Sequence, residues 1–408
     1  MADLAPFEGL RYSDSALDTP AVLAPPYDVL NDDERDSLLE RDPHNVVAID
    51  LPVAPSVMAA GGGVASDYRD AGDRFRQWCA DGVLRRDPAS LYVHRMNWIC
   101  DGQERSTTGV IGALALPSEN SSLGGPTLTP LDILPHEQTT PKASTDRLEL
   151  TRATRANLSP IWVLTPSPGF AGLLHPTGDP VLDTHLGGTR HRLWVISSEV
   201  EITRISTALS DHPVVVADGH HRLGVALAYR EESVGDGSQV GGADRVLALV
   251  TELVPDSVEI HGIHRLIRTW PTEADPIDVL GQWFTIANVD VSEHELVPLL
   301  ETKDAMALIT ARGQWLLRAR PELDLGTFDT DRLQHALNRI GASEIGYHHS
   351  EKFVRQEVAG GNAVAAVLVR PPTISQIMAV ANGGTRMPPK STFFSPKPPT
   401  GMVFRSLD

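Results

Sequence analysis

The chain of 408 residues has little cysteine and no long apolar run. Its two cysteines, Cys79 and Cys100, fit no metal-binding or redox spacing, so we expect reduced, buried thiols rather than a disulfide framework. No stretch of about 18 apolar residues is present, and a transmembrane helix is therefore not expected. The first residues lack the basic flank and the apolar segment of a secretory signal. These shortages together predict a soluble, cytoplasmic protein.

Positive charge is scarce as well. Lysine and arginine number 35 against 53 acidic residues, which gives a formal net charge of -18. A field of that sign repels nucleic acids and anionic lipids, so neither is expected as a partner, although a local basic pocket can still hold a small anion. Only five of the basic residues are lysines. Where arginine is the default cation, a lysine marks a place that needs a compact ammonium, unless the few that remain do so by chance. They are Lys142, Lys303, Lys352, Lys390 and Lys397.

Composition and patterning otherwise indicate a globular protein of mixed α+β class. Hydrophobic residues make up 41% of the chain and charged residues 22%, which suits a large core in two or three structural units. Asn31 is placed to cap a helix through Leu39, and the apolar spacing predicts a second helix over 67–80. Residues 91–99 and 106–116 are strand-like and are joined through Asp101-Gly102, which is a hairpin signal.

The coarse pattern predicts four regions. These are an N-terminal α+β region over 1–165, a core over 166–270, a supporting subdomain over 271–350, and a C-terminal strand, helix and basic tail over 351–408. We expect the tail to return to the cleft formed by the core.

The strongest chemical signal is the segment from Val214 to Arg222. A short β-branched run, 214–217, predicts a strand buried on both faces, and a helix follows from Leu223. Between them stand Asp218, Gly219, His220, His221 and Arg222.

A glycine between a strand and a helix lets a ligand approach the backbone, and the first N–H groups of the helix form an anion site. Arg222 adds a bidentate grip on phosphate, and His220 and His221 add donors. Asp218 is placed to bind Mg²⁺ or to accept a proton from a hydroxyl. The alternative is a tight turn with a capping aspartate and surface histidines. Adjacent histidines at a helix start point about 100° apart, which argues against a shared zinc ion.

A second polar cluster lies between apolar segments over 134–147. Glu137, which follows His136, is a candidate general base or metal ligand, and Lys142 and Arg147 are candidate phosphate contacts. Asp146 completes the cluster. The alternative interpretation is a solvated charged loop.

The third cluster is the C-terminal tail. Lys390, Ser391 and Lys397 are placed to close over a phosphate, unless the tail is a strand anchored by aromatic burial. Near the start of the chain, Tyr27 and Asp28 follow a rigid Pro-Pro pair and are candidates to line the same cleft, or else form a well-packed turn.

In their order along the chain, these segments resemble the bacterial and archaeal family known as domain of unknown function 1015. The resemblance covers nearly the whole chain. It rests on Pro6-Phe7 with Leu10-Arg11-Tyr12; Ala24-Pro25-Pro26-Tyr27-Asp28-Val29; Asn45-Val46-Val47; Leu134-Pro135-His136-Glu137 with Lys142 and Asp146-Arg147; 152–161; His191-Arg192-Leu193-Trp194; 217–222; and Met387-Pro388 with Lys390-Ser391-Thr392.

The turn at 218–222 also looks like the nucleotide-phosphate loop of the ParB and sulfiredoxin fold group, which includes free serine kinases. That likeness implies a ParB/sulfiredoxin-like nucleotide-binding core with additional α+β subdomains. It also implies that Gly219, His220, His221 and Arg222 bind nucleotide phosphates, with Asp218 beside them. ATP or ADP and Mg²⁺ are the cofactors that it implies. The chain is far longer than the minimal fold, and the group's catalytic glutamate aligns with no certain position here.

Three functions fit these residues. The first is a small-molecule kinase, with free L-serine as the acceptor that the likeness suggests, Asp218 or Glu137 as the base, and His221 in the catalytic turn. The second is a nucleotide-binding switch that acts on a protein partner. The third is a phosphatase of a phosphorylated metabolite, with His220 or His221 as acid or nucleophile. All three need a small phosphorylated ligand.

Overall fold

The computed structural model describes most of the chain. The described residues are 2–13, 20–60, 62–100, 102–117, 133–138, 141–235, 241–254, 257–271, 275–342 and 344–408. Helices and strands are mixed along the chain, which confirms the α+β class. The chain divides into two compact units. The first comprises Met1–Pro135, Thr139–Val258 and Pro396–Asp408, and the second comprises His136–Gln138 and Glu259–Ser395. Each is described by itself below.

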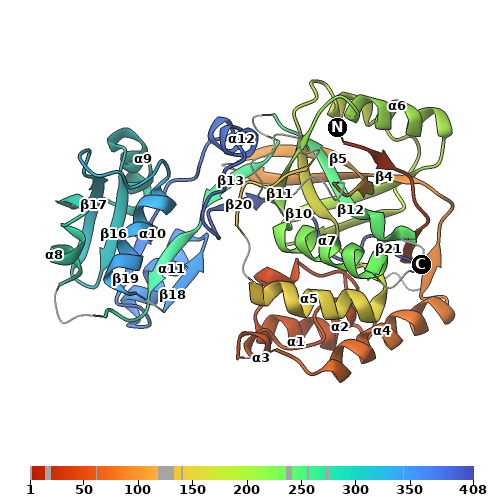
Figure 1. Cartoon of the computed structure of the whole chain (residues 1–408), viewed down its shortest axis with the longest axis horizontal. Coiled ribbons are helices and arrows are strands. Elements are labelled where there is room, and N and C mark those ends of the chain that lie inside the picture. Colours follow the sequence, from red (N-terminus) through yellow and green to blue (C-terminus); the bar gives the residue numbers. More distant parts are fainter. Residues whose placement is uncertain are drawn as a thin grey trace. The chain divides into compact units, whose positions relative to one another are not determined.

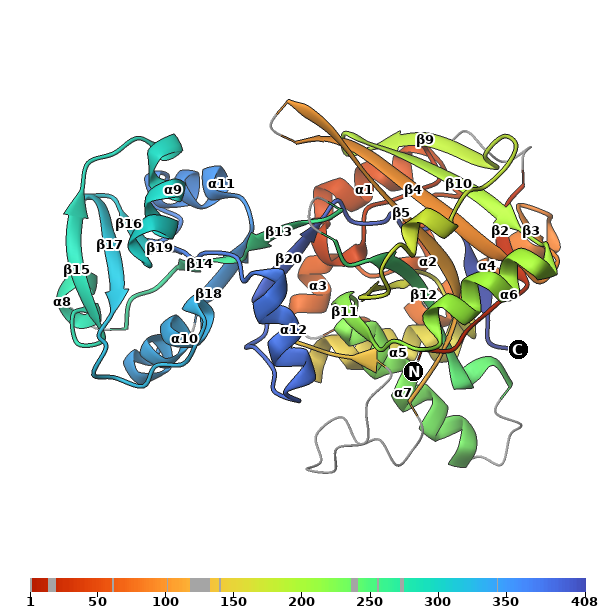
Figure 2. The same ribbon diagram turned by 90° about the horizontal axis from the view of Figure 1, so that it is seen from above.

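The first unit is built on a mixed sheet in the order β6-β11-β8-β12-β5-β4-β10-β9, with β1 also paired to β5. Its strands are β1 (Leu4–Ala5), β4 (Leu91–Cys100), β5 (Gln103–Ala115), β6 (Ile133–Leu134), β8 (Ile161–Thr165), β9 (Leu182–Leu186), β10 (Thr189–Ile196), β11 (Val214–Asp218) and β12 (Arg245–Glu252). Strands β4 and β5 form a long hairpin (Figure 2), as the two strand-like segments around Asp101-Gly102 predict. Asp101, in the predicted turn, lies outside the described residues.

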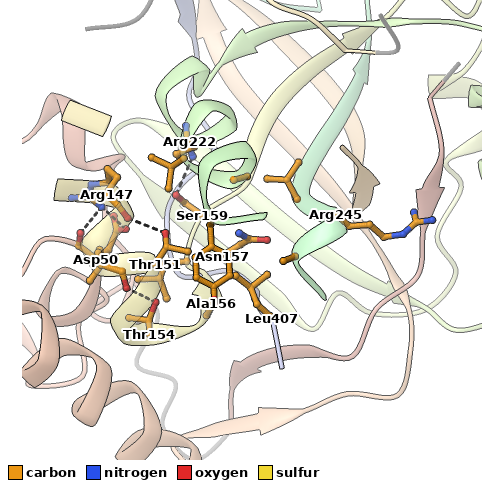
Figure 3. Close-up of a pocket in the computed structure, with 17 residues that line it drawn as sticks. Asp50, Arg147, Thr151, Thr154, Ala156, Asn157, Ser159, Arg222, Arg245 and Leu407 are labelled. Carbon is orange, nitrogen blue, oxygen red and sulfur yellow. Dashed lines mark hydrogen bonds and ion pairs between the residues drawn. The ribbon is translucent and has the colours of Figure 1, made fainter. Parts of the chain in front are cut away.

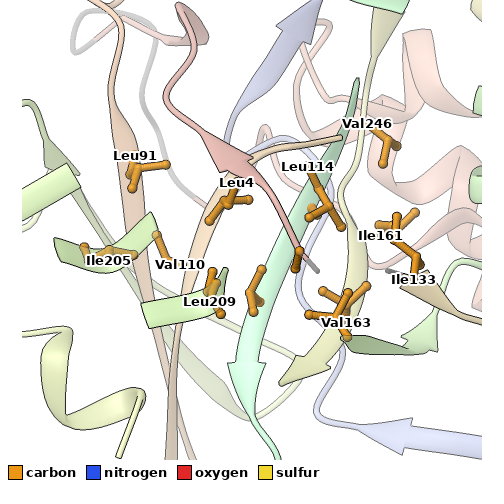
Figure 4. Packing of buried hydrophobic residues seen from close by; sticks show 14 of the residues in the cluster. Leu4, Leu91, Val110, Leu114, Ile133, Ile161, Val163, Ile205, Leu209 and Val246 are labelled. Atoms are coloured by element: carbon orange, nitrogen blue, oxygen red, sulfur yellow. The ribbon is translucent and has the colours of Figure 1, made fainter. Parts of the chain in front are cut away.

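One face of this sheet carries a continuous hydrophobic core (Figure 4). Val110 and Leu114 from β5, Ile161 and Val163 from β8, and Val246 from β12 are at most 2% exposed. Two helices cover them, α6 (Glu199–Leu209) through Ile205 and Leu209, and α7 (His220–Gly235) through Leu223 and Ala226. Burying side chains of this size contributes roughly 1.5–3 kcal/mol each. Strand β11, which ends at the polar turn 218–222 and pairs with β8, is part of the same core and is therefore firmly held.

Further helices and a smaller sheet complete the first unit. The helices are α1 (Asp32–Arg41), α2 (Val47–Asp50), α3 (Pro55–Ala60), α4 (Ala65–Ala80) and α5 (Pro141–Thr154). Helix α4 packs on α5, and α5 packs on α7 (Figure 1). The smaller sheet has the order β3-β2-β21-β7, formed by β3 (Leu84–Arg86), β2 (Gly9–Tyr12), β21 (Phe404–Ser406) and β7 (Ala156–Asn157). Segments from both ends of the chain therefore share one sheet.

The second unit contains a six-stranded antiparallel sheet in the order β15-β17-β16-β19-β14-β18. Its strands are β14 (His264–Ile267), β15 (Phe284–Val289), β16 (Met306–Thr310), β17 (Gly313–Ala319), β18 (Ile345–His348) and β19 (Ala365–Leu368). Helices α8 (Pro276–Leu280) and α10 (Asp329–Ile340) cover one hydrophobic face, and α9 (Glu293–Lys303) and α11 (Glu351–Ala359) cover the other. Strands β13 (Glu259–Gly262) and β20 (Thr392–Ser395) pair separately, and α12 (Ile374–Asn382) precedes β20.

The local sequence signals account for most of these elements. Asn31 caps α1, and its side chain accepts a hydrogen bond from the Glu34 amide while the Glu34 carboxylate returns to the Asn31 amide. Thr373 and Gln376 form the same reciprocal cap on α12. The predicted buried strand before Asp218 is β11, and 214–217 are all buried.

Three expectations need comment. The alternative interpretation of the cluster over 134–147, a solvated charged loop, does not hold from Pro141 onward. Residues 141–147 form the first two turns of α5, because the helix is anchored through buried Arg147 and Leu150. Cys79 and Cys100 are half-buried rather than buried. The four predicted regions remain a prediction, since the two units observed are discontinuous in sequence.

Among the described helices, none is long and apolar enough to cross a membrane.

Candidate functional site

The turn between β11 and α7 in the first unit has the geometry that only glycine adopts readily. Gly219 has a φ of +94°, and a Cβ atom there would lie 3.0 Å from Nε of Arg222. The helix begins at the next residue, and the amide of Leu223 already bonds to the Gly219 carbonyl at 2.9 Å. The N–H groups of the first turn of an α-helix have no intrahelical partners, so this end of α7 is suited to an anion.

Asp218, the last residue of β11, forms an ion pair with Lys397 from the C-terminal segment. Nζ of Lys397 lies 2.7 Å from one carboxylate oxygen of Asp218 and 3.0 Å from a carboxylate oxygen of Asp28. The Lys397 side chain is only 9% exposed. Burial alone would lower its pKa, but the two carboxylates outweigh burial and raise the pKa above its ordinary value. Lys397 therefore carries a permanent positive charge between two aspartates.

Arg222 holds the other side of Asp218. One terminal nitrogen of its guanidinium lies 2.5 Å from the second Asp218 oxygen. The other terminal nitrogen donates to Oγ of Ser159 at 3.0 Å and to the carbonyl of Pro160. The pair is mostly shielded, with side-chain exposures of 15% and 17%. Asp218 is thus shared between a lysine and an arginine at the start of a helix.

Tyr27, beside Asp28, extends this arrangement toward α5. The Arg147 guanidinium stacks 3.7 Å from the centre of the Tyr27 ring. Arg147 also donates to the carboxylate of Asp50 at 3.0 Å and to the Asp50 carbonyl at 2.6 Å. Burial raises the pKa of Tyr27, and the charge of Arg147 partly opposes that rise. The phenol therefore stays neutral at physiological pH.

We call these seven side chains the charged network: Tyr27, Asp28, Asp50, Arg147, Asp218, Arg222 and Lys397. It contains three carboxylates and three cations, so its net formal charge is zero. The balance explains how so many charges are held in a partly buried place.

A cavity of about 50 Å³ adjoins the network in the first unit (Figure 3). Arg222 and Ser159 lie on one side of it, and Arg147 and Asp50 on another. The remaining wall comes from α5, α7 and strand ends, including Thr151, Asn157, Tyr229, Arg245 and Leu407. A cavity of this size holds one or two water molecules or a small group, not a nucleoside.

The other predicted site residues of the first unit lie at the starts of α7 and α5. His220 and His221 are half-buried in the first turn of α7. Lys142 lies at the start of α5, and its side chain is outside the described part of the structure. Asp146, one turn later, accepts a hydrogen bond from the Tyr68 hydroxyl at 2.9 Å.

Glu137 from the second sequence cluster and Lys390 and Ser391 from the third meet within the second unit. The Glu137 carboxylate accepts the amides of Lys390 at 2.6 Å, Ser391 at 3.0 Å and Thr392 at 3.3 Å, and also the Thr392 hydroxyl at 3.2 Å. Burial raises the pKa of Glu137, while the three backbone amides and the charge of Lys390 oppose the rise. Its neighbour His136 is fully buried and contacts the Thr392 hydroxyl at 2.9 Å.

This geometry favours an anchoring role for Glu137. Both of its oxygens are engaged by the backbone of 390–392, where Lys390 has a φ of +61°. Glu137, Lys390 and Ser391 thus form one group in the second unit, and Asp28, Asp218, Arg222 and Lys397 form another in the first. The expectation that all three clusters share one cleft stays a prediction.

Comparison with known proteins decides the family. The family model described as "Protein of unknown function (DUF1015)" matches residues 4–342. The chain belongs to the DUF1015 family. The match spans the charged network except for Lys397, and it confirms the resemblance seen in the sequence. A search of curated proteins found no match for this DUF1015 chain.

Solved structures show distant similarity. A free serine kinase in complex with AMP aligns at 13% identity and a TM-score of 0.38, covering 64% of this chain and 83% of that chain. A conserved hypothetical protein from Pyrococcus furiosus aligns at 13% identity and a TM-score of 0.37, covering 64% and 87%. SbnI with a C-terminal truncation, from Staphylococcus aureus, aligns at 13% identity and a TM-score of 0.38, covering 65% and 79%. Similarity at this level is too low to argue an activity from.

The sequence did not reveal two members of the DUF1015 site. Asp50 ends the short helix α2 directly after the Asn45-Val46-Val47 motif, and Ser159 lies within the matching segment 152–161. The only sequence signal that could have indicated Asp50 and Ser159 was their position next to, or within, segments that resemble the family. Nothing in the sequence indicated that they pair with Arg147 and Arg222.

Proposed function

We propose that this protein is a phosphotransferase that moves a phosphoryl group from ATP or ADP to the hydroxyl of a small metabolite, with free L-serine as the first acceptor to test. One observation carries the proposal: Asp218 is shared by Lys397 and Arg222 at the N-terminus of α7. A helix terminus, a compact ammonium and a planar guanidinium are suited to phosphate oxygens, and a carboxylate beside them is suited to a hydroxyl proton.

The charge balance of the network predicts a need for a metal ion. Because the three carboxylates and three cations cancel, a polyphosphate entering alone would add uncompensated negative charge to a partly buried place. A nucleotide accompanied by Mg²⁺ brings its own compensation. Mg²⁺ commonly takes one or two carboxylates together with phosphate oxygens. The described residues contain no group of three or more histidine, cysteine or acidic side chains arranged for a metal. We therefore assign most of the ligation to phosphates and water.

Ligand binding would then exchange partners within the network. Phosphate oxygens would replace the carboxylates on Lys397 and Arg222, which releases Asp28 and Asp218. Asp218, at the helix N-terminus, would accept the acceptor hydroxyl's proton, or would ligate Mg²⁺ together with Asp28. The new bond joins the acceptor oxygen to the terminal phosphorus, and the bond to the bridging oxygen of the nucleotide breaks. Asp218 is preferred to Glu137 as the base because both oxygens of Glu137 already accept backbone amides.

The test is phosphorus NMR on the purified protein with Mg²⁺, ATP or ADP, and pooled hydroxyl amino acids. We expect a new phosphomonoester signal that falls about 100-fold or more in rate for Asp218→Asn. Asp211→Asn is the matched control, because Asp211 is an exposed aspartate just before β11. The wild-type rate should be retained in that control and lost on removal of Mg²⁺.

Other results would overturn the proposal and favour one of the remaining functions. Release of inorganic phosphate from nucleotide, with no dependence on any acceptor, would indicate a nucleotide switch. Hydrolysis of O-phosphoserine without nucleotide would indicate a phosphatase. Nucleotide that stays intact with every acceptor would exclude all phosphoryl transfer from these donors.

A further inference from the structure

The second unit contains a cavity of about 360 Å³ that is separate from the groups described so far. The last turn of α9, the first turn of α10, the segment after β19 and the start of α12 form its wall. The lining residues are Glu301, Asp304, Thr327, Phe328, Asp329, Thr330, Arg332, Arg370, Pro371, Pro372, Thr373 and Gln376. The volume lies in the range of small-metabolite sites, which is roughly 300–1,000 Å³.

A buried ion pair fixes one part of the wall. Arg370 donates to Asp329 through Nε at 2.9 Å and through a terminal nitrogen at 2.7 Å, and the Arg370 amide bonds to the same carboxylate at 3.0 Å. The Asp329 side chain is only 4% exposed. These contacts raise the pKa of Arg370. The other terminal nitrogen of its guanidinium donates to the Asp304 carboxylate at 2.5 Å. The charge of Arg370 is therefore largely neutralised, and its role is to shape the wall.

Arg332 offers the positive charge that a ligand can use. Its guanidinium contacts are long: Nε to the Gly326 carbonyl at 3.3 Å and a terminal nitrogen to Asp329 at 3.6 Å. Arg332 lies in the first turn of α10, whose N-cap residue, Phe328, has no side-chain oxygen to cap the helix. The first turn of α10 already carries Asp329 and Asp331, so the loosely held guanidinium of Arg332 is the group that suits a ligand carboxylate.

The last turn of α9 supplies the opposite charge. Glu301 is exposed and has no ion-pair partner within the described ranges, whereas Asp304 at the helix end is paired with Arg370. The Glu301 carboxylate suits an ammonium group. A dicarboxylate would face repulsion from Glu301, and a diamine would face repulsion from Arg332, so a ligand that carries one group of each sign is favoured.

We propose that this cavity binds a free α-amino acid, with its carboxylate on Arg332 and its ammonium on Glu301. Thr330, which lines the cavity, accepts a hydrogen bond from the Ser391 hydroxyl at 3.1 Å, and Glu137 accepts one from the Ser391 amide. The site is independent of phosphoryl transfer, whose groups lie in the first unit.

The test is isothermal titration calorimetry with single L-amino acids, and with succinate and putrescine as single-sign probes. It uses full-length protein carrying Asp218→Asn, so that any acceptor site in the first unit is impaired. We expect one saturable site per chain for an amino acid at millimolar concentration or below. Arg332→Gln and Glu301→Gln should each weaken binding about tenfold or more, the loss expected for a charge-assisted contact.

Two matched controls keep this test specific. Arg339 lies in the last turn of α10 and Glu344 lies just before β18, and neither lines the cavity. Arg339→Gln and Glu344→Gln should bind as the parent does, and circular dichroism should show all four variants folded. The proposal is overturned by the absence of saturable amino-acid binding, by tighter binding of succinate or putrescine, or by binding that Arg332→Gln and Glu301→Gln leave unchanged. Phosphoryl transfer by an otherwise native Arg332→Gln protein would report separately on the first unit.

Discussion

At the scale of single residues, Gly219 gives the sharpest test of the turn before α7. Its φ of +94° costs an L-residue about 1–2 kcal/mol, and a Cβ would press on the Arg222 guanidinium. We therefore expect Gly219→Ala to lower the free energy of unfolding by at least that amount and to displace Arg222 from Asp218. Urea unfolding gives the first quantity, and phosphoryl transfer reports the second.

The control for that variant lies in the same helix. Gly224 has ordinary helical backbone angles, and a Cβ there would meet no atom within 4 Å. Gly224→Ala should be neutral or slightly stabilising, because alanine is the better helix former. Equal losses of stability in the two variants would contradict the special geometry assigned to Gly219.

Lys397 is the residue on which the charged network depends most. Lys397→Met leaves Asp28 and Asp218 without the cation between them, and removal of one partner from a buried pair costs about 3 kcal/mol or more. Because Asp28 is partly exposed, we expect the free energy of unfolding of Lys397→Met to fall by about 3 kcal/mol or somewhat less. Urea unfolding at neutral pH measures this difference.

Adding Asp28→Asn to Lys397→Met should recover part of the stability, since one uncompensated carboxylate is then gone. Lys352→Met is the matched control, because Lys352 is exposed on α11. A stability for Lys397→Met indistinguishable from that of the control would show that the ion pairs contribute nothing.

At the scale of elements, the buried histidine pair on β4 and β10 predicts sensitivity to acid. His94 and His191 contact each other at 3.2 Å and are at most 2% exposed. Burial lowers the pKa of His94 and lowers that of His191 from 6.5 to about 4. Between about pH 6.5 and about pH 4, His191 binds a proton in the unfolded chain but not in the folded chain. The free energy of unfolding therefore falls as the pH drops through this range.

His191 alone should lower the free energy of unfolding by about 1 kcal/mol between about pH 7.5 and about pH 5.5. Urea unfolding at the two pH values should show a smaller difference for His191→Gln than for the parent. His175→Gln, at an exposed position of the first unit that does not shift the pKa of His191, should keep the parent's difference. If His191→Gln also keeps it, the proton uptake lies elsewhere.

The same scale shows what the sequence predicts and what it does not. Caps such as Asn31 with Glu34 and the apolar run before Asp218 are local signals, so the elements that they mark were predicted. Helix α5 was missed at its start because buried Arg147 is stabilised by Tyr27 and Asp50, which are distant in sequence. Local polarity therefore suggested a loop.

The candidate site divides in a similar way. The residues of the turn, 218–222, were found because their chemistry is contiguous. The partners were not, because Lys397 joins Asp28 and Asp218 only through the fold, and Glu137 is held by backbone amides that no pattern of side chains can show. The nearby tail residues Lys390 and Lys397 belong to different units, although only a few residues separate them.

At the scale of the whole molecule, the C-terminal segment belongs to the first unit and not to the second unit that precedes it. It supplies Lys397 and β21, which lies between β2 and β7 in the smaller sheet. Ending the chain after Ser395 should therefore destabilise the first unit, because buried Val403, Phe404 and Leu407 are removed together.

Limited proteolysis followed by mass spectrometry checks this expectation. Cleavage should concentrate within 1–135 and 139–258 of the shortened chain, while residues 259–395 stay protected. Removal of Asp408 alone is the control, because that residue is exposed and its side chain pairs with exposed Arg155 at the surface. Equal protection of the first unit in the shortened and complete chains would contradict the role given to the segment.

The position of β21 also has a consequence for the order of folding. Gly9 and Leu10 pair with Arg405 and Phe404, so this part of the smaller sheet can form only after residues 404–405 have been synthesised. The same C-terminal segment carries Lys397, and the charged network is complete only when that segment is in place. Until then, Asp28 and Asp218 lack their shared cation.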